Sequence, residues 1–184
     1  MRALASAVGM VWFGIATIAV AAVVAGPSSD EELVAEAGYV LTGTVERVEG
    51  QWSPDGGQIY SFVDIRVGEA IKGTPGTDVI RLRVLGGEVD GFGMQVVDGP
   101  TFVPGEEAVF FLERNPQTLF PLVGLAAGKV PIVTDATTRA RSVPGRAMAR
   151  DAYVDRLRAI VAAQALGAGP TTLDVPLAPK AGEP

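Results

Sequence analysis

The chain contains neither cysteine nor histidine. Without cysteine, it can form no disulfide, thiolate nucleophile, iron–sulfur cluster or cysteine-ligated zinc site. Without histidine, serine–histidine–aspartate and cysteine–histidine catalysis are excluded, together with histidine general bases and nearly all zinc chemistry. What remains is carboxylate, lysine, hydroxyl or tyrosine chemistry, or binding without chemistry.

Positive charge is scarce over most of the chain. The 184 residues carry 15 Lys+Arg against 21 Asp+Glu, a net charge of −6, and residues 26–134 hold seven basic and sixteen acidic side chains. Such an acidic body argues against nucleic acid as a partner. Six arginines gather between Ala136 and Arg158. We interpret them as a solvated helix face that offsets the acidic body, with contact to an anionic surface as the alternative.

The first 25 residues have the composition of a targeting segment. Arg2 gives a positive end, and Ala3 to Ala25 is apolar or small apart from Ser6 and Thr17. This pattern predicts a secretory signal peptide at 1–25, and hence a secreted, periplasmic or cell-envelope protein. The alternative is an uncleaved transmembrane anchor, because about 20 apolar residues span a bilayer. Only in that case do we expect contact with a membrane.

The rest of the chain predicts one domain. A chain of this length buries roughly 70% of its unfolded surface in a single core, and we assign that domain to residues 26–166 and expect a monomer. Residues 167–184 contain four prolines and little that could pack, so we predict a disordered tail there.

Two strands joined by a tight turn form the centre of the predicted domain. Ile59, Val63, Ile65 and Val67 share one face of the first strand with Ser61. In the second strand Ile80, Leu82 and Val84 alternate with Arg81 and Arg83. This period of two is that of a half-buried strand. Between them, residues 72–76 read KGTPG, a typical turn sequence.

Further short elements, separated by turn sequences, come before and after these two strands. Ser29 and Glu32 predict a capping box that starts a short helix. The other expected elements are strands at 39–48, with a bend at Gly43, and at 94–97, 107–112, 119–125 and 128–134, and an amphipathic helix at 146–166. We therefore predict a mainly β protein, a small antiparallel OB-like barrel of about five to seven strands with a short N-terminal helix and a C-terminal amphipathic helix.

The strands carry a resemblance to a known family. The successive segments Val40-Leu41-Thr42-Gly43-Thr44-Val45, Ile59-Tyr60-Ser61-Phe62, Val67-Gly68-Glu69-Ala70-Ile71-Lys72-Gly73 and Pro104-Gly105-Glu106-Glu107-Ala108-Val109 resemble the netrin-like module shared with tissue inhibitors of metalloproteinases. They also resemble cysteine-free bacterial secreted proteins of unknown function, which share Val123 to Val130 as well. The resemblance implies a five-stranded OB-type barrel with helices beside it. Those inhibitors bind zinc through an amino-terminal cysteine, which this chain lacks, so only the barrel is transferred.

Two loops hold the candidate binding residues. Trp52 and Asp55 fall in the predicted loop 49–57, and Asp90 and Phe92 fall in the glycine-rich loop 86–105. Aromatic side chains on barrel loops commonly anchor ligands or partners. For Trp52 the alternative is that its indole covers one mouth of the barrel as part of the core.

The acidic residues of these loops could also suggest chemistry. Asp55, Glu88, Asp90 and Asp98 could gather around calcium, but their spacing matches no EF-hand, and acids beside glycine usually form turns. Glu106, Glu107 and Asp64 could suggest a two-carboxylate hydrolase, but no second signal supports one. We therefore expect no catalytic residue, no metal and no cofactor.

Our first hypothesis is a secreted, non-enzymatic barrel that binds an extracellular protein, with a protease as one candidate. The alternative is a small envelope enzyme or ligand-binding barrel that uses the glycine-rich loop 86–105. A third hypothesis is an anchored accessory domain.

Overall fold

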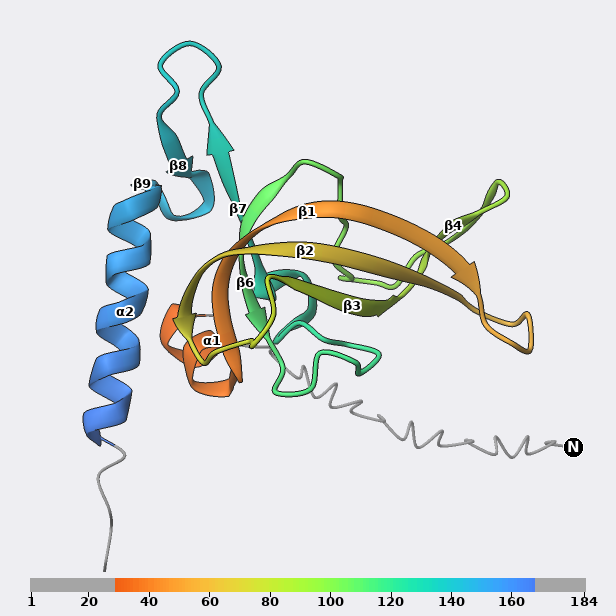
Figure 1. Ribbon diagram of the computed structural model, residues 1–184, viewed down its shortest axis with the longest axis horizontal. Coiled ribbons are helices and arrows are strands. Elements are labelled where there is room, and N and C mark those ends of the chain that lie inside the picture. The colour runs from red at the N-terminus through yellow and green to blue at the C-terminus, as the bar shows by residue number, and fades with distance from the viewer. Residues whose placement is uncertain (1–28, 168–184) are drawn as a thin grey trace, which may run out of the picture.

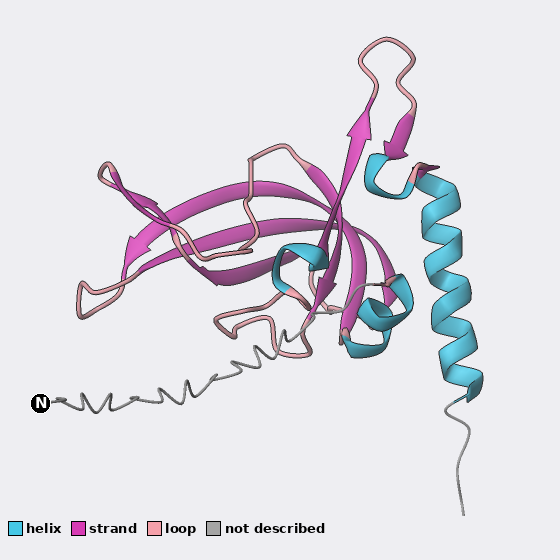
Figure 2. Ribbon diagram, turned by 180° about the vertical axis from the view of Figure 1, so that it is seen from behind, coloured by secondary structure: helices cyan, strands magenta, loops and turns pink. Residues whose placement is uncertain are grey.

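The computed structural model describes residues 29–167. The predicted signal peptide at 1–25 lies outside these residues, and so does the predicted tail apart from Gly167. Figures 1 and 2 show the described chain as a strongly curved sheet with both helices towards one end. Among residues 29–167, no helix is long and apolar enough to cross a membrane.

The elements follow one another as short helix, strands and long helix. The helices are α1 (Asp30–Glu36) and α2 (Arg150–Gly167), and η1 (Leu125–Gly128) and η2 (Pro144–Arg146) are 3₁₀ turns. The strands are β1 (Tyr39–Trp52), β2 (Ile59–Lys72), β3 (Val79–Leu85), β4 (Gly87–Val89), β5 (Phe92–Met94), β6 (Glu107–Leu112), β7 (Lys129–Thr134), β8 (Arg141–Val143) and β9 (Met148–Ala149).

Helix α1 begins with the predicted capping box. The Glu32 backbone N–H donates to Ser29 Oγ over 3.2 Å, and the Ser29 N–H donates to the Glu32 carboxylate over 3.2 Å. At the other end of the helix, Lys72 Nζ donates to the Val34 carbonyl oxygen at 2.5 Å. A cation there opposes the negative end of the helix dipole. The turn after β2 is therefore tied to α1.

Seven strands form one antiparallel sheet in the order β3-β2-β1-β6-β7-β8-β9, and β4 and β5 form a separate two-stranded ribbon. The expected mainly β class with a C-terminal helix is confirmed. Register shifts in β1 at Thr42/Gly43 and Val45/Arg47 help the sheet to curve. Within the described chain no strand ladder closes the sheet into a barrel. Instead, Leu119 accepts a hydrogen bond from the β3 residue Leu85 at 3.4 Å.

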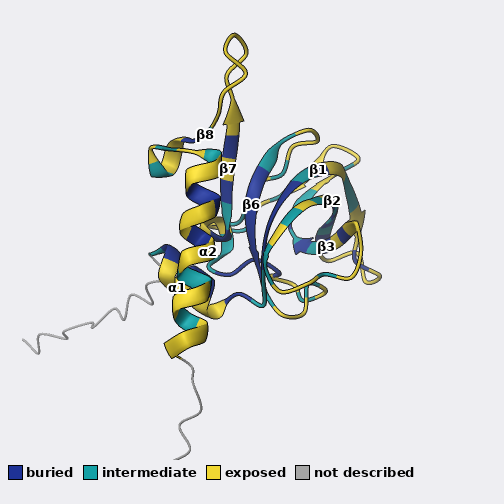
Figure 3. Ribbon diagram, turned by 60° about the vertical axis from the view of Figure 1, so that its left-hand side comes forward, coloured by how far each residue is buried: buried dark blue, intermediate teal, exposed yellow. Residues whose placement is uncertain are grey.

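Two hydrophobic clusters lie on the two faces of the sheet, and Figure 3 shows the buried residues in the curved strands and along α2. The inner cluster, which includes Val63, Ile65 and Leu82, lies inside the curve of the sheet. The outer cluster, which includes Leu33, Tyr153 and Leu157, lies between the sheet and both helices. Strand β6 belongs to both, because Ala108, Phe110 and Leu112 face the inner cluster while Val109 and Phe111 face the outer one. Its continuous apolar sequence follows from burial on both sides.

Helix α2 covers the outer cluster with the predicted face. Tyr153 and Leu157 are buried, and Ile160 and Val161 pack against the same cluster. The helix begins at Arg150 rather than at Arg146, because β8, η2 and β9 occupy residues 141–149. Strands of two or three residues are too short to show a period of alternating side chains.

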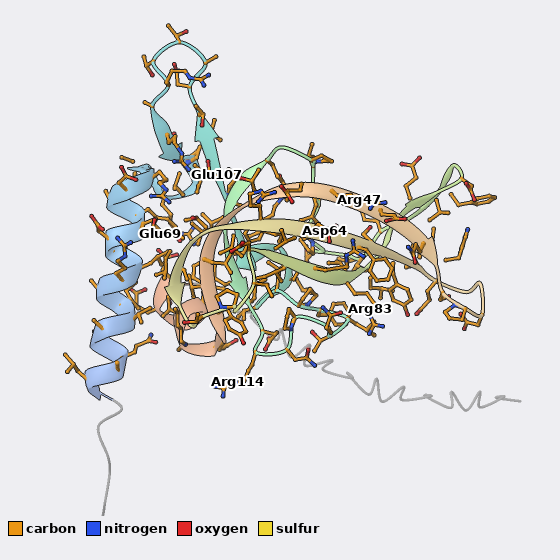
Figure 4. All side chains as sticks on the ribbon, in the orientation of Figure 1. Arg47, Asp64, Glu69, Arg83, Glu107 and Arg114 are labelled. Atoms are coloured by element: carbon orange, nitrogen blue, oxygen red, sulfur yellow. The ribbon has the colours of Figure 1, made fainter. Side chains whose placement is uncertain are left out.

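The arginine-rich segment binds the acidic body directly. Five of its six arginines pair with carboxylates on α1, β2 and β6, and Figure 4 shows two of these carboxylates, Glu69 and Glu107, on the side of the sheet towards α2 and β8. The pairs are Arg141–Glu107, Arg146–Asp30, Arg150–Glu69, Arg156–Glu31 and Arg158–Glu69. The segment offsets the acidic body as expected, but it does so through ion pairs that dock the helix.

Three predicted strand boundaries are wrong. β1 continues to Trp52 because Gln51 and Trp52 pair with Tyr60 and Ile59, so residues 49–52 are not loop. Residues 95–97 lie outside any strand, and the glycine-rich region instead forms the β4–β5 hairpin. In the predicted strand 119–125 only Leu122 makes a bridge, to Leu112, because the backbone turns at Gly124, where φ is 64°.

Candidate binding surface

The candidate surface begins where the inner face of β1 runs beyond the core. Val48, Gly50 and Trp52 share one face of the strand, since side chains alternate, and Val48 packs against the inner cluster. Trp52 ends this row with 42% of its surface exposed. Trp52 belongs to neither hydrophobic cluster, so the alternative that its indole is part of the core is wrong.

The β4–β5 hairpin crosses over this end of β1. Asp90 and Gly91 have φ values of 51° and 81°, the left-handed pair that a two-residue hairpin turn requires. A Cβ atom on Gly50 would lie 2.1 Å from the Glu88 carbonyl oxygen. Glycine at position 50 therefore lets the hairpin approach the strand.

This crossing brings two of the predicted residues together. The rings of Trp52 and Phe92 lie 5.9 Å apart, edge to face, at 61°. Such a pair is favourable by about 1 kcal/mol beyond its buried area. Phe92 nevertheless keeps 64% of its surface exposed. The contact leaves an apolar surface open to solvent at the end of the molecule opposite α2 (Figure 1).

The other two predicted residues shape the turns around the aromatic pair. Asp55 accepts hydrogen bonds from Ser53 Oγ at 2.5 Å and from the Gly57 N–H at 3.3 Å, and these bonds, the serine one first, hold the pKa of Asp55 below its usual value. Asp90 occupies the hairpin turn and is exposed. Both act as turn formers, and both place a carboxylate near this end.

A cleft of about 700 Å³ lies beside the aromatic pair, between the sheet and the glycine-rich segment. Its floor comes from Val48, Gly50, Ser61 and Val84, and its wall comes from the β4–β5 hairpin and residues 95–102. Gly93 and Met94, which follow Phe92, line it directly. The cleft therefore adjoins the strand ends that carry the aromatic pair.

Lys129 holds the outer wall of this cleft. Its Nζ atom donates to the Thr101 carbonyl oxygen and to both Glu106 oxygens, at 2.8 and 2.9 Å. It also lies 5.3 Å from the centre of the Phe102 ring, a residue that lines the cleft. The Lys129 side chain is only 10% exposed. This lysine therefore ties the glycine-rich segment to β7.

The acidic residues do not converge on the cleft. Glu88 is the only charged side chain among its lining residues, and Asp90, Asp98 and Glu106 are not among them. In the part of the chain that the structure describes, no group of three or more acids could hold a metal ion.

The three carboxylates of the hydrolase alternative each have a cationic partner. Asp64 pairs with Arg81 at 2.6 Å on the outer face of the sheet (Figure 4), and this hydrogen bond, foremost, lowers the pKa of Asp64. Glu106 pairs with Lys129, and Glu107 pairs with Arg141. They lie in separate ion pairs rather than in a shared site.

Sequence reasoning missed two residues that build this surface. Gly50 was assigned to the loop 49–57, and Lys129 was assigned only to the predicted strand 128–134. The β4–β5 hairpin could have been predicted, since Asp90-Gly91 between Val89 and Phe92 is a typical sequence for a two-residue turn. No sequence signal could show that Lys129 reaches Thr101.

Comparison with protein-family models finds none that matches the chain, and comparison with curated proteins finds no match either.

Proposed function

We propose that the protein is a non-enzymatic binding module that engages another protein through the surface formed by Trp52, Phe92 and the adjacent cleft. The contact between Trp52 and Phe92 carries this proposal. The two rings come from separate hairpins, touch each other at 5.9 Å and remain 42% and 64% exposed. Aromatic residues of this kind are enriched at protein interfaces and often dominate their binding energy.

The surroundings of the pair support a protein partner. Tight turns fix both hairpins, so the rings are presented on ordered backbone, which lowers the entropic cost of binding. The cleft next to them can accept an apolar side chain of the partner. Secretion, indicated by residues 1–25, and an extracellular protease as partner remain parts of this proposal that rest on the sequence.

A small-ligand function is the second candidate, and the cleft favours it. Its volume of about 700 Å³ falls within the range of ligand pockets, roughly 300–1,000 Å³. The lining offers glycine backbone, aliphatic groups, the Phe102 ring, the polar side chains of Ser61, Gln95 and Thr101, and one carboxylate, Glu88. That chemistry suits binding of an apolar molecule better than catalysis, because no lining base stands beside a nucleophile.

The test is recovery of a protein partner from the secreted fraction of the source cells, with the partner identified by mass spectrometry. The bait is the wild-type protein or one of the variants Trp52→Ala and Phe92→Ala. We expect the same partner to be recovered with wild type and to be lost with either variant.

Phe120→Ala is the matched control. Phe120 is exposed to a similar degree, 45%, but it lies in the loop after β6 and does not line the cleft. We expect this variant to recover the partner as wild type does. Equal recovery by Trp52→Ala would contradict the proposed function, and so would loss with Phe120→Ala alone.

A further inference from the structure

The charge around the proposed surface has one sign. Residues 48–58 and 86–105, which supply Trp52, Phe92 and most of the cleft, contain no lysine or arginine. The same two segments contain five acids: Glu49, Asp55, Glu88, Asp90 and Asp98. Glu88 lines the cleft, and Asp90 lies two residues from Phe92.

The rest of the molecule does not share this imbalance. At the α2 end, the arginines pair with Asp30, Glu31 and Glu69, so charges there largely neutralise one another. On the outer face of β2 and β3, Asp64 pairs with Arg81. Near Trp52, Glu49 pairs with Arg47 at 2.8 Å, whereas Glu88 and Asp90 form no ion pair with another described residue. The charge of these two carboxylates is thus left for a partner.

We propose that the partner presents a basic segment to this surface, one in which arginine or lysine alternates with an apolar residue. The inference rests on the proposed function and names the chemistry of its partner. The cationic side chain lies across Trp52 and Phe92, and the neighbouring apolar side chain enters the cleft.

The physical basis is the combination of aromatic faces and carboxylates. A guanidinium or ammonium group is attracted to the face of an indole or phenyl ring, and its aliphatic stem packs on the same surface. Glu88 and Asp90 add charge attraction, which speeds association and disfavours acidic partners. The glycine backbone and aliphatic lining of the cleft then receive the apolar residue.

The same charges disfavour the other macromolecules that exposed aromatic rings could bind. A nucleic acid or an anionic membrane would bring further negative charge to a surface whose two supplying segments, residues 48–58 and 86–105, contain no lysine or arginine. A basic protein segment removes that repulsion.

The test uses the fluorescence of Trp52 in the full chain carrying Trp12→Phe, because Trp12 is the other tryptophan and lies outside the described residues. The probes are two synthetic peptides of equal length, one alternating arginine with leucine and one alternating glutamate with leucine. We expect the arginine peptide to change the Trp52 emission saturably and the glutamate peptide to leave it unchanged.

Variants without the charges of Glu88 and Asp90 test whether these two carboxylates attract the arginine peptide. The double variant Glu88→Gln/Asp90→Asn keeps side-chain size, and asparagine tolerates the left-handed backbone at position 90. We expect it to weaken binding of the arginine peptide by about five-fold, with a matching loss of salt dependence. Glu36→Gln, an exposed acid of α1, is the control and should bind as wild type.

Three results would overturn the inference: equal binding of the two peptides, no binding of either, or an unchanged affinity in the double variant. A blue shift of Trp52 emission with phosphatidylcholine vesicles and not with the arginine peptide would also overturn it, in favour of a membrane. If Trp52→Ala loses the cellular partner while the double variant keeps it, the protein-binding function stands and only the basic partner is wrong. If Trp52→Ala keeps that partner, both proposals fail.

Discussion

The Tyr153 hydroxyl donates a hydrogen bond of 2.9 Å to the carboxylate of Asp30, which lies 123 residues earlier in the chain. Both residues are buried. Arg146 Nε donates to the same carboxylate at 2.8 Å. The first residue of α1 thus receives groups from η2 and from α2, and the two helices are joined by a buried polar contact.

Removal of the Asp30 carboxylate should destabilise the protein strongly. Asp30→Ala leaves the Tyr153 hydroxyl and the Arg146 guanidinium without their acceptor, which costs about 3 kcal/mol. The free energy of unfolding in urea measures the loss. Glu36→Ala, an exposed change on the same helix, should stay within about 0.5 kcal/mol of wild type, and equal effects of the two variants would contradict the role of Asp30.

Alkaline pH should lower the stability of the folded protein through Tyr153. Burial first, and then the charge of Asp30, raise the pKa of Tyr153 above its ordinary value of 10.0. Above that pH the unfolded chain releases the phenol proton while the folded protein retains it, so the free energy of unfolding falls as pH rises. Below pH 10.0 this contribution is fully present.

Tyr153→Phe isolates this effect. It removes one hydrogen bond, at a cost of about 1 kcal/mol at neutral pH, together with the titrating group. We expect the difference in unfolding free energy between wild type and this variant to shrink as pH rises from about 9 to about 11.5. A difference that stays constant over this range would show that Tyr153 is not the responsible group.

Loss of the Lys129 ammonium should release the wall of the cleft. Lys129→Met removes the cationic partner of the half-buried Glu106 carboxylate and the donor to the Thr101 carbonyl oxygen, at a cost of about 3 kcal/mol. Hydrogen exchange should become faster at residues 99–106. The double variant Lys129→Met/Glu106→Gln should be more stable than Lys129→Met alone, because no unpaired charge remains.

A side chain at position 50 should lift the β4–β5 hairpin. In Gly50→Ala the new Cβ atom meets the Glu88 carbonyl oxygen at 2.1 Å, so the backbone must move and Phe92 must leave Trp52. We expect Trp52 emission to shift to the red and the proposed binding to weaken. Gly145→Ala is the control, because a Cβ there meets nothing within 4 Å. An unchanged emission in Gly50→Ala would show that the hairpin adapts without separating the rings.

Local signals in the sequence predicted most of the fold. The capping box of α1, the alternation in β2 and β3, the apolar run of β6 and the buried face of α2 are each written in neighbouring residues, and each was confirmed. Errors occurred where strands are short or lack an amphipathic pattern. β8 and β9 have three and two residues, and the glycines of β4 and β5 have no side chain to show a period.

The candidate surface was predictable only in part. Trp52 and Phe92 could be selected as exposed aromatic residues, but their contact depends on the hairpin crossing at Gly50, which is a tertiary event. The partners of the arginines, such as Glu69 with Arg158, were likewise invisible, because ion pairs between distant segments leave no local pattern.

Strand β6 contributes side chains to both hydrophobic clusters, so the unfolding of one cluster is coupled to that of the other. Phe110 and Phe111 are adjacent in the chain yet lie in different clusters, and both are fully buried. Neither cluster can open without displacing the backbone that the other needs. The helical side and the curved sheet should therefore melt in a single cooperative transition rather than as two independent units.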